Sequence, residues 1–382
     1  MAESRLSTLH LSTAHTWRGG ENQILLLAQG LVARGHRALV VAPKGAPLLE
    51  RAHEAGLATR ALTLRGELNP AGAWRLARLL REVRPDVLHL HDGHAVLPGQ
   101  LAARALPGSR LAVIAHRRTS FPLRGRWKYA GRVDKVIAIS QAARERVLAA
   151  GVAPARVAVV YSGLEFPAPA PREGLALRRE LGLSPEAVLI AHAAALTAEK
   201  RTGDLLAALR LCAAGNSGDS LDVHAVPRIP AAPDVHLAIA GSGELEGALR
   251  ELARRLNVAG RVHFLGFRRD LRPLWAAAQI AAFSSEAEGL CTALIEAQGA
   301  GLPAIVTDAG GMVEVVAAQV TGLVAPVGAI EELAAAFRRL AADAVLREQL
   351  GSAARARARK HFSAAAMVEN TLRVYREVRA AR

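Results

Sequence analysis

Two glutamates, Glu288 and Glu296, stand eight positions apart, where a strand-like apolar run passes into a helix-like one. At a rise of ~1.5 Å per helical residue, about 10 Å separates them along the chain. That spacing does not fit two acids acting across one bond, but it fits contacts with both ends of an elongated ligand. The helix between them is opened by Gly289, Leu290, Cys291 and Thr292. Free N–H groups at a helix start attract a diphosphate, although a capped helix with a solvated glutamate has the same pattern.

Further residues with suitable chemistry follow other predicted strands. Gly19 and Gly20 follow the first strand and lead into a helix expected from Glu21, so the backbone can approach a ligand closely. Lys200 follows the first strand of the second half, where a lysine can neutralise a leaving diphosphate, although a surface lysine is the more frequent case. Gly243 belongs to another glycine turn that opens a helix. The glycine spacing of a dinucleotide-binding fingerprint is absent, so no nicotinamide cofactor is implied.

A histidine-rich segment, His89 to His94, follows the predicted strand 86–90. We expect His89 and His91 to point to opposite faces of that strand, His91 toward a ligand and His89 into the interior. Metal binding needs converging ligands, and no cysteine or further histidine run supports it here. The sequence therefore predicts no metal site.

The elements that must hold these residues are short apolar strands alternating with longer amphipathic helices. The alternation runs over 6–161, stops in the Pro- and Ala-rich stretch 166–174 and restarts from 188. Strands separated by helices imply parallel sheets covered on both faces. We therefore predict an α/β protein of two Rossmann-like, doubly wound domains facing each other across a cleft, with ligands at the carboxyl ends of the strands.

The predicted domain boundaries follow from the same alternation. The first domain takes 1–165, and the C-terminal helix at about 364–382 packs back on it. A linker covers 166–174, and the second domain takes 175–363. Residues 213–235, rich in Gly, Asn, Ser, Asp and Pro, predict an exposed insertion in the second domain.

Composition limits the class of protein further. The chain has 382 residues, 51% hydrophobic and 22% charged, which excludes a disordered chain. Two cysteines exclude a disulfide scaffold, and no signal-peptide core or long apolar span is found, so an intracellular protein is expected. The net charge of +15 predicts anionic partners, while 4% aromatic residues argue against a nucleic-acid binder built on base stacking.

Taken together, these segments resemble the family 4 glycosyltransferases, retaining enzymes of GT-B fold, over nearly the whole chain. The most specific piece is the pair Glu288 and Glu296 in the run SSEAEGLCTALIEAQGAGLPAIV. The supporting pieces are RGGEN at 18–22, DVLHLHDGHA at 86–95, VIAISQAAR at 136–144, VVYSGLEF at 159–166 and LTAEKR at 196–201. Their order and spacing make the resemblance specific.

The resemblance implies a role for each matched position. Three residues would be catalytic: Lys200 at the diphosphate leaving group, Glu288 at the donor sugar and His91 near the reacting carbon. Glu296 would hold the nucleotide ribose. The other donor-binding positions would be Gly19, Gly20, Gly243, Phe267, Arg268, Gly289, Leu290, Cys291 and Thr292, with the base near Phe267 and Arg268 and with Gly20 approaching the diphosphate from the other domain. No cofactor and no metal would be required.

The sequence departs from the family pattern at one point. Many members of the family have an arginine that accompanies the lysine matched by Lys200 at the diphosphate. Ala194 and Ala195 occupy its places here. Arg201, Arg117 and Arg118 are the candidates to replace it.

The first domain contains a basic segment that contributes to the positive net charge and could bind an anionic partner. Its members are Arg117, Arg118, Arg124, Arg126, Trp127 and Lys128. We hypothesise that they contact an anionic acceptor or membrane surface; a solvated basic helix pair is the alternative.

The sequence thus predicts a retaining glycosyltransferase that moves a hexose-type sugar from a nucleotide-diphosphate sugar to a glycan or lipid-linked acceptor. The expected process is cell-envelope polysaccharide or lipopolysaccharide synthesis, in the cytoplasm or on the inner face of the plasma membrane. Two alternatives stay open: a nucleotide-sugar epimerase of the same fold, and a basic membrane- or nucleic-acid-binding module with a degenerate cleft. No nucleic acid is expected as a partner.

Overall fold

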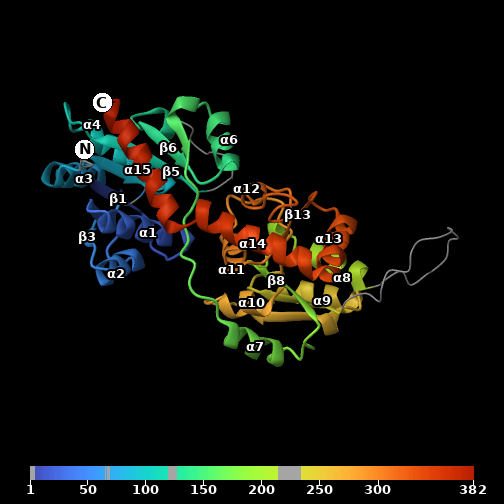
Figure 1. Ribbon diagram of the computed structural model, residues 1–382. Helices are drawn as coiled ribbons and strands as arrows, with labels where there is room; N and C mark the ends of the chain where they lie inside the picture. Colours follow the sequence, from blue (N-terminus) through green and yellow to red (C-terminus); the bar gives the residue numbers. More distant parts are fainter. Residues whose placement is uncertain (1–4, 65, 67–68, 119–126, 214–233) are drawn as a thin grey trace. The chain divides into compact units, whose positions relative to one another are not determined.

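The computed structural model describes residues 5–64, 66, 69–118, 127–213 and 234–382. The chain divides into two compact units (Figure 1). The first consists of Met1–Glu165 and His361–Arg382, and the second of Phe166–Lys360.

The first unit is built on a parallel sheet of seven strands in the order β3-β2-β1-β4-β5-β6-β7. The strands are β1 (Ser7–Leu11), β2 (Arg37–Ala42), β3 (Ala58–Ala61), β4 (Val87–Leu90), β5 (Ala112–Arg117), β6 (Lys135–Ala138) and β7 (Val157–Val159). The helices are α1 (Gly19–Ala33), α2 (Pro47–Glu54), α3 (Pro70–Val83), α4 (Gly93–Arg104), α5 (Trp127–Ala130), α6 (Gln141–Ala149) and α15 (Ala364–Ala380). Every residue of β1 and β4 is buried, as expected of central strands covered by helices on both faces.

Helix α1 begins two residues earlier than its apolar pattern predicts. Arg18 precedes the helix, and its backbone N–H donates to the Glu21 carboxylate at 2.8 Å, which closes the first turn. The sequence placed Gly19 and Gly20 in the loop before the helix. In the structure they belong to its first turn.

The C-terminal helix α15 packs on α1 of the first unit, although more than 300 positions separate them in the sequence (Figure 1). Gly30 permits this approach, since a Cβ there would lie 2.4 Å from Cγ2 of Val368. Tyr375, two turns further along the same face of α15, is completely buried. The helix is thus an integral part of the first unit's core.

The second unit contains a parallel sheet of six strands in the order β10-β9-β8-β11-β12-β13. The strands are β8 (Val188–Ala193), β9 (Val235–Ala240), β10 (Val262–Gly266), β11 (Ile280–Phe283), β12 (Ala304–Thr307) and β13 (Gly322–Ala325). The helices are α7 (Pro171–Glu180), α8 (Thr202–Ala213), α9 (Glu246–Arg255), α10 (Arg272–Ala277), α11 (Thr292–Ala300), α12 (Met312–Val315), α13 (Ile330–Ala342) and α14 (Ala344–His361). One continuous core joins this sheet to α8, α9 and α13.

The Pro- and Ala-rich stretch 166–174 is helical only at its end. Residues 166–170 form no helix or strand, and helix α7 begins at Pro171 and packs against α10 in the second unit. Proline fits the first turn of a helix because the missing N–H would be unbonded there in any case. Most of the predicted insertion, 214–233, lies outside the described residues. Among the described helices, none has the length and apolar character needed to cross a membrane.

Candidate active site

The sheet of the second unit reverses its strand order between β8 and β11, and open α/β sheets bind ligands at such a point. Lys200 ends the short 3-10 turn η2 (Ala198–Lys200) that follows β8, and Glu288 lies in the loop after β11. The two residues therefore stand on either side of the switch point, at the carboxyl ends of their strands.

Lys200 and Glu288 form a partly buried ion pair. The Lys200 Nζ lies 2.5 Å from Oε1 of Glu288, and the Ser285 hydroxyl donates to the same oxygen at 3.1 Å. Burial lowers the pKa of Lys200, but the attraction of Glu288 outweighs this effect and the net pKa is raised. Lys200 is therefore cationic at neutral pH. Both side chains keep some contact with solvent, with 19% and 11% of their surfaces exposed.

Hydrogen bonds between two loops hold this pair in register. The Ser284 hydroxyl donates to the carbonyls of Lys200 (3.1 Å) and Arg201 (2.8 Å), and the Glu286 N–H donates to the Glu199 carbonyl at 2.9 Å. These bonds fasten the turn after β8 to the end of β11. The position of the lysine is thus fixed by the backbone and not only by its ion pair.

Gly310 sets the position of the Glu288 loop. Its φ is +50°, and a Cβ there would lie 2.1 Å from the Glu288 carbonyl oxygen. We expect Gly310→Ala to lower both the melting temperature and donor affinity, because the alanine must displace the loop that carries Glu288. The matched control is Gly182→Ala, at a φ of +64° with open space around the new methyl group, which adds only the backbone strain. Equal donor affinities in the two variants, measured by calorimetry, would contradict this account.

Glu296 lies on α11, whose start is not capped by the side chain of Cys291, the residue before the helix. Burial raises the pKa of Glu296; the Trp275 indole lies against the carboxyl and partly opposes the rise, without meeting hydrogen-bond geometry. Leu290 and Cys291 have buried side chains, and Thr292 is exposed. Burial also raises the pKa of the Cys291 thiol, with the nearby Glu288 adding to it, so the thiol stays protonated. What this helix start offers a ligand is therefore its backbone N–H groups.

A separate cavity of about 300 Å³ lies at the carboxyl ends of β8, β9 and β10. Phe267 and Arg268 line it together with Gly241 and Ser242, and Phe267 is 76% exposed. Gly243 follows directly and packs on the Leu196 backbone. The structure thus brings the predicted base-binding residues together beside one cavity.

In the first unit, the strand order reverses between β1 and β4, and Gly20 and His91 lie just beyond these two strands. Both line a pocket of about 160 Å³, together with His116, Arg118 and Tyr129. We call it the Arg118 pocket. The sequence pointed to Gly20 and His91, but it gave His116 no role and placed Arg118 only on a basic surface or beside the diphosphate.

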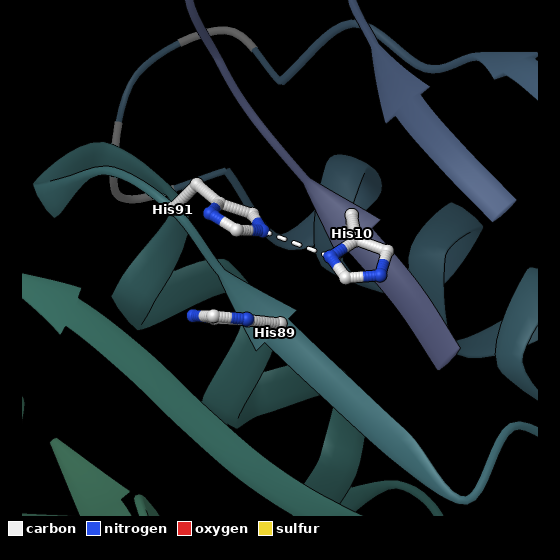
Figure 2. A group of neighbouring side chains, drawn as sticks. All are labelled: His10, His89 and His91. Atoms are coloured by element: carbon white, nitrogen blue, oxygen red, sulfur yellow. Dashed lines mark hydrogen bonds between the residues drawn. The ribbon is translucent and has the colours of Figure 1, made fainter. Parts of the chain in front are cut away.

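The predicted orientation of His89 and His91 is wrong. Their rings stack with centroids 3.9 Å apart, because residues two positions apart in a strand share a face. His10 of β1 lies in register with His89 and joins them, as Figure 2 shows. His116 stacks on His89 from β5 at 5.3 Å. Histidines spaced on neighbouring strands were the signal that could have indicated this cluster.

A directional chain of hydrogen bonds fixes the protons of this cluster. Arginine can only donate, so Arg118 Nη2 donates to Nδ1 of His91 at 3.2 Å, and His91 carries its proton on Nε2. That proton is donated to His10 Nδ1 at 3.0 Å, the dashed bond of Figure 2. His10 then donates from Nε2 to the Thr8 hydroxyl at 2.9 Å, which donates to the Arg37 carbonyl. Burial lowers the pKa of His10 to about 3 and that of His91 well below its usual value, so both rings are neutral.

The nitrogens of His10, His89 and His91 lie close enough together to surround a metal ion, since one atom of each falls within 4.8 Å of the others. Both nitrogens of His10 and His91 are already used in the chain, however. A cation would have to break these bonds beside the buried charge of Arg118, and none of the three residues supplies an anionic ligand. The geometry favours a hydrogen-bonded network that orients His91.

The predicted basic surface is only partly described. Arg118 bonds to His91 and lines the pocket, so it is not available to a membrane surface as hypothesised. Arg117 and Lys128 both interact with other residues of the chain. Arg124 and Arg126 lie outside the described residues, and Trp127 is described only as the start of α5. Arg201, a candidate second cation, pairs with Asp204 at 2.7 Å and Glu286 at 3.5 Å in the second unit.

Comparison with known proteins gives two family matches that together span most of the chain. The model described as Glycosyltransferase Family 4 matches residues 17–166, and the model described as Glycosyl transferases group 1 matches residues 176–357. The chain belongs to the family 4 glycosyltransferases. Within this glycosyltransferase, the second match covers Lys200, Glu288 and Glu296, and the first covers His91 and Arg118.

Two relatives of this glycosyltransferase are similar over part of their lengths. The D-inositol 3-phosphate glycosyltransferase of Kribbella flavida is 30% identical over 248 residues, which are 64% of this chain and 56% of that protein. The lipopolysaccharide core biosynthesis glycosyltransferase LpsE of Rhizobium meliloti is 34% identical over 128 residues, 34% of this chain and 37% of LpsE. The chain therefore covers less than two thirds of either relative.

A solved structure agrees over nearly the whole glycosyltransferase chain. Anabaena HepE in complex with UDP superimposes with a TM-score of 0.81 at 21% identity, covering 97% of this chain and 100% of HepE. At that identity the likeness shows the fold alone. It confirms the predicted GT-B class, with two Rossmann-like units of parallel sheet.

Proposed function

We propose that this glycosyltransferase moves a hexose-type sugar from a nucleotide-diphosphate sugar to a glycan or lipid-linked acceptor, with retention of anomeric configuration. The observation that carries the proposal is the Lys200–Glu288 pair at the switch point of the second sheet, next to the uncapped start of α11. A cation and free N–H groups at a strand end suit a diphosphate that gains charge as the sugar leaves.

Each side chain then has a defined task. Glu296 accepts hydrogen bonds from the ribose hydroxyls of the donor, and Glu288 accepts a hydrogen bond from a hydroxyl of the sugar. Lys200 stabilises the diphosphate when the bond between the anomeric carbon and the phosphate oxygen breaks. A new bond forms from that carbon to an acceptor oxygen, whose proton departs with the diphosphate. The cavity beside Phe267 and Arg268 takes the base.

Names of similar proteins support the choice of process and substrate. LpsE is a lipopolysaccharide core glycosyltransferase, and HepE binds UDP. We therefore place the reaction in the synthesis of lipopolysaccharide or another cell-envelope glycan, on the cytoplasmic side of the membrane. The Kribbella relative takes an inositol phosphate, which supports an anionic acceptor.

A melting-temperature screen over nucleotide sugars tests this function, because a ligand that binds only the folded chain raises that temperature. We expect one uridine- or guanosine-diphosphate sugar to raise it by several degrees. NMR of the transfer product should then show the donor's anomeric configuration retained. An inverted product, or no response to any nucleotide sugar, contradicts the proposal. Conversion of the donor alone into its epimer would favour the epimerase.

A further inference from the structure

Among the side chains that line the Arg118 pocket, His116 and Arg118 each have a buried nitrogen atom with no hydrogen-bond partner in the described part of the first unit. The two atoms are Nε2 of His116 and Nε of Arg118. A buried N–H without an acceptor is costly and uncommon, so each such atom needs an explanation. Both residues line the same pocket of about 160 Å³.

The protonation of His116 follows from a second chain of hydrogen bonds. The Tyr375 hydroxyl lies 2.6 Å from Nδ1 of His89, and Nε2 of His89 lies 3.3 Å from Nδ1 of His116. If the hydroxyl donates, the Tyr375 and His89 protons both find acceptors, and the His116 proton lies on Nε2, which faces the pocket. The opposite direction would leave the tyrosine proton itself unbonded in the interior. His116 therefore presents an N–H to the pocket.

Arg118 brings a positive charge to the same place. Burial lowers the pKa of Arg118 to about 10, against the attraction of Glu21 and Asp92, so the group is cationic at neutral pH. Neither carboxylate meets its Nε. Asp92 accepts from the backbone N–H and the hydroxyl of Thr13, both at 2.7 Å, and Glu21 accepts from the Arg18 N–H. Within the described ranges, which omit 119–126, Nε of Arg118 thus has no acceptor.

We propose that the Arg118 pocket binds a phosphate or carboxylate group of the acceptor molecule, an assignment that rests on the proposed transferase function. Its volume equals that of about five liquid water molecules at ~30 Å³ each, which suits one such group but not a nucleotide. Arginine and a neutral imidazole N–H together form a charge-assisted site for an oxyanion. Arg118 then restricts the acceptor to anionic molecules, while its bond to His91 orients that ring.

Melting curves of the full chain with inorganic phosphate and with UDP test the assignment. Saturating phosphate should raise the melting temperature of the native chain by about 5 °C. Arg118→Met should lose this rise, and without phosphate it should melt no lower than the native chain, because an unpaired buried charge has been removed. The control is Arg78→Met, at an exposed arginine of α3, which should keep the full response.

Two outcomes overturn the proposal. If Arg118→Met keeps the phosphate response, the pocket is not the anion site. If it loses UDP affinity together with phosphate affinity, the pocket serves the donor diphosphate. Should the methionine variant fail to fold, Arg118→Lys keeps the charge without the Nε donor, and its phosphate affinity should fall about tenfold. The proposed function can fail independently: no nucleotide sugar would then bind, while the phosphate response would persist.

Discussion

Replacing Lys200 with methionine should lower kcat by about 10²- to 10³-fold, the usual effect of removing one group that stabilises developing negative charge. The affinity for the donor should change much less, because the largest charge on the diphosphate develops only as the sugar leaves. Steady-state kinetics together with calorimetry of the donor separates the two effects. A kcat within threefold of the native value would exclude Lys200 as the leaving-group cation.

The loss of Lys200 also leaves the Glu288 carboxylate partly buried without its partner, which lowers stability. The double variant Lys200→Met with Glu288→Gln removes that unpaired charge. We expect the double variant to recover much of the melting temperature and none of the turnover. This comparison distinguishes a catalytic loss from a loss of folded protein.

Replacing Glu296 with glutamine should weaken donor binding by roughly 10- to 100-fold, the range expected when hydrogen bonds to a charged acceptor are lost. The same change should raise the melting temperature at neutral pH, because the partly buried carboxylate no longer has to be ionised. Glu332→Gln, at an exposed glutamate of α13, is the control and should change neither quantity. Unchanged donor affinity in Glu296→Gln would remove the ribose contact from the proposal.

The raised pKa of Glu296 also determines how stability and donor affinity change with pH. Between the ordinary glutamate pKa and this raised value, the folded chain holds a proton that the unfolded chain has released. The contribution of Glu296 therefore makes the native protein more stable as pH falls through that window. Donor affinity should fall over the same window, since the protonated carboxyl accepts hydrogen bonds less well. Glu296→Gln should lose both trends.

The alternation of strands and helices was readable from the sequence, because both periodicities are local. The spacing of Glu288 and Glu296 and the glycine turns after strands likewise indicated the donor site that we propose, and the family matches confirm the family that these patterns resemble. The sequence did not predict that helix α7 begins at Pro171 inside the stretch 166–174, since Pro and Ala suit both a linker and the start of a helix, and α7 packs on α10. Local composition cannot anticipate such a tertiary contact.

By itself, the sequence determined which residues carry charge and roughly where each strand ends. Only the tertiary structure decided which of them meet: Lys200 and Glu288 lie 88 positions apart, and His89 and Tyr375 lie 286 apart. The neighbouring positions of β8 and β11 in their sheet create the first contact, and the packing of α15 on the first sheet creates the second. The histidine network likewise arises because β1, β4 and β5 are neighbours, so that rings from three strands share one face. The two-residue period of a strand determines the face on which each histidine ring lies. Which other rings it contacts depends on which strands are neighbours in the sheet.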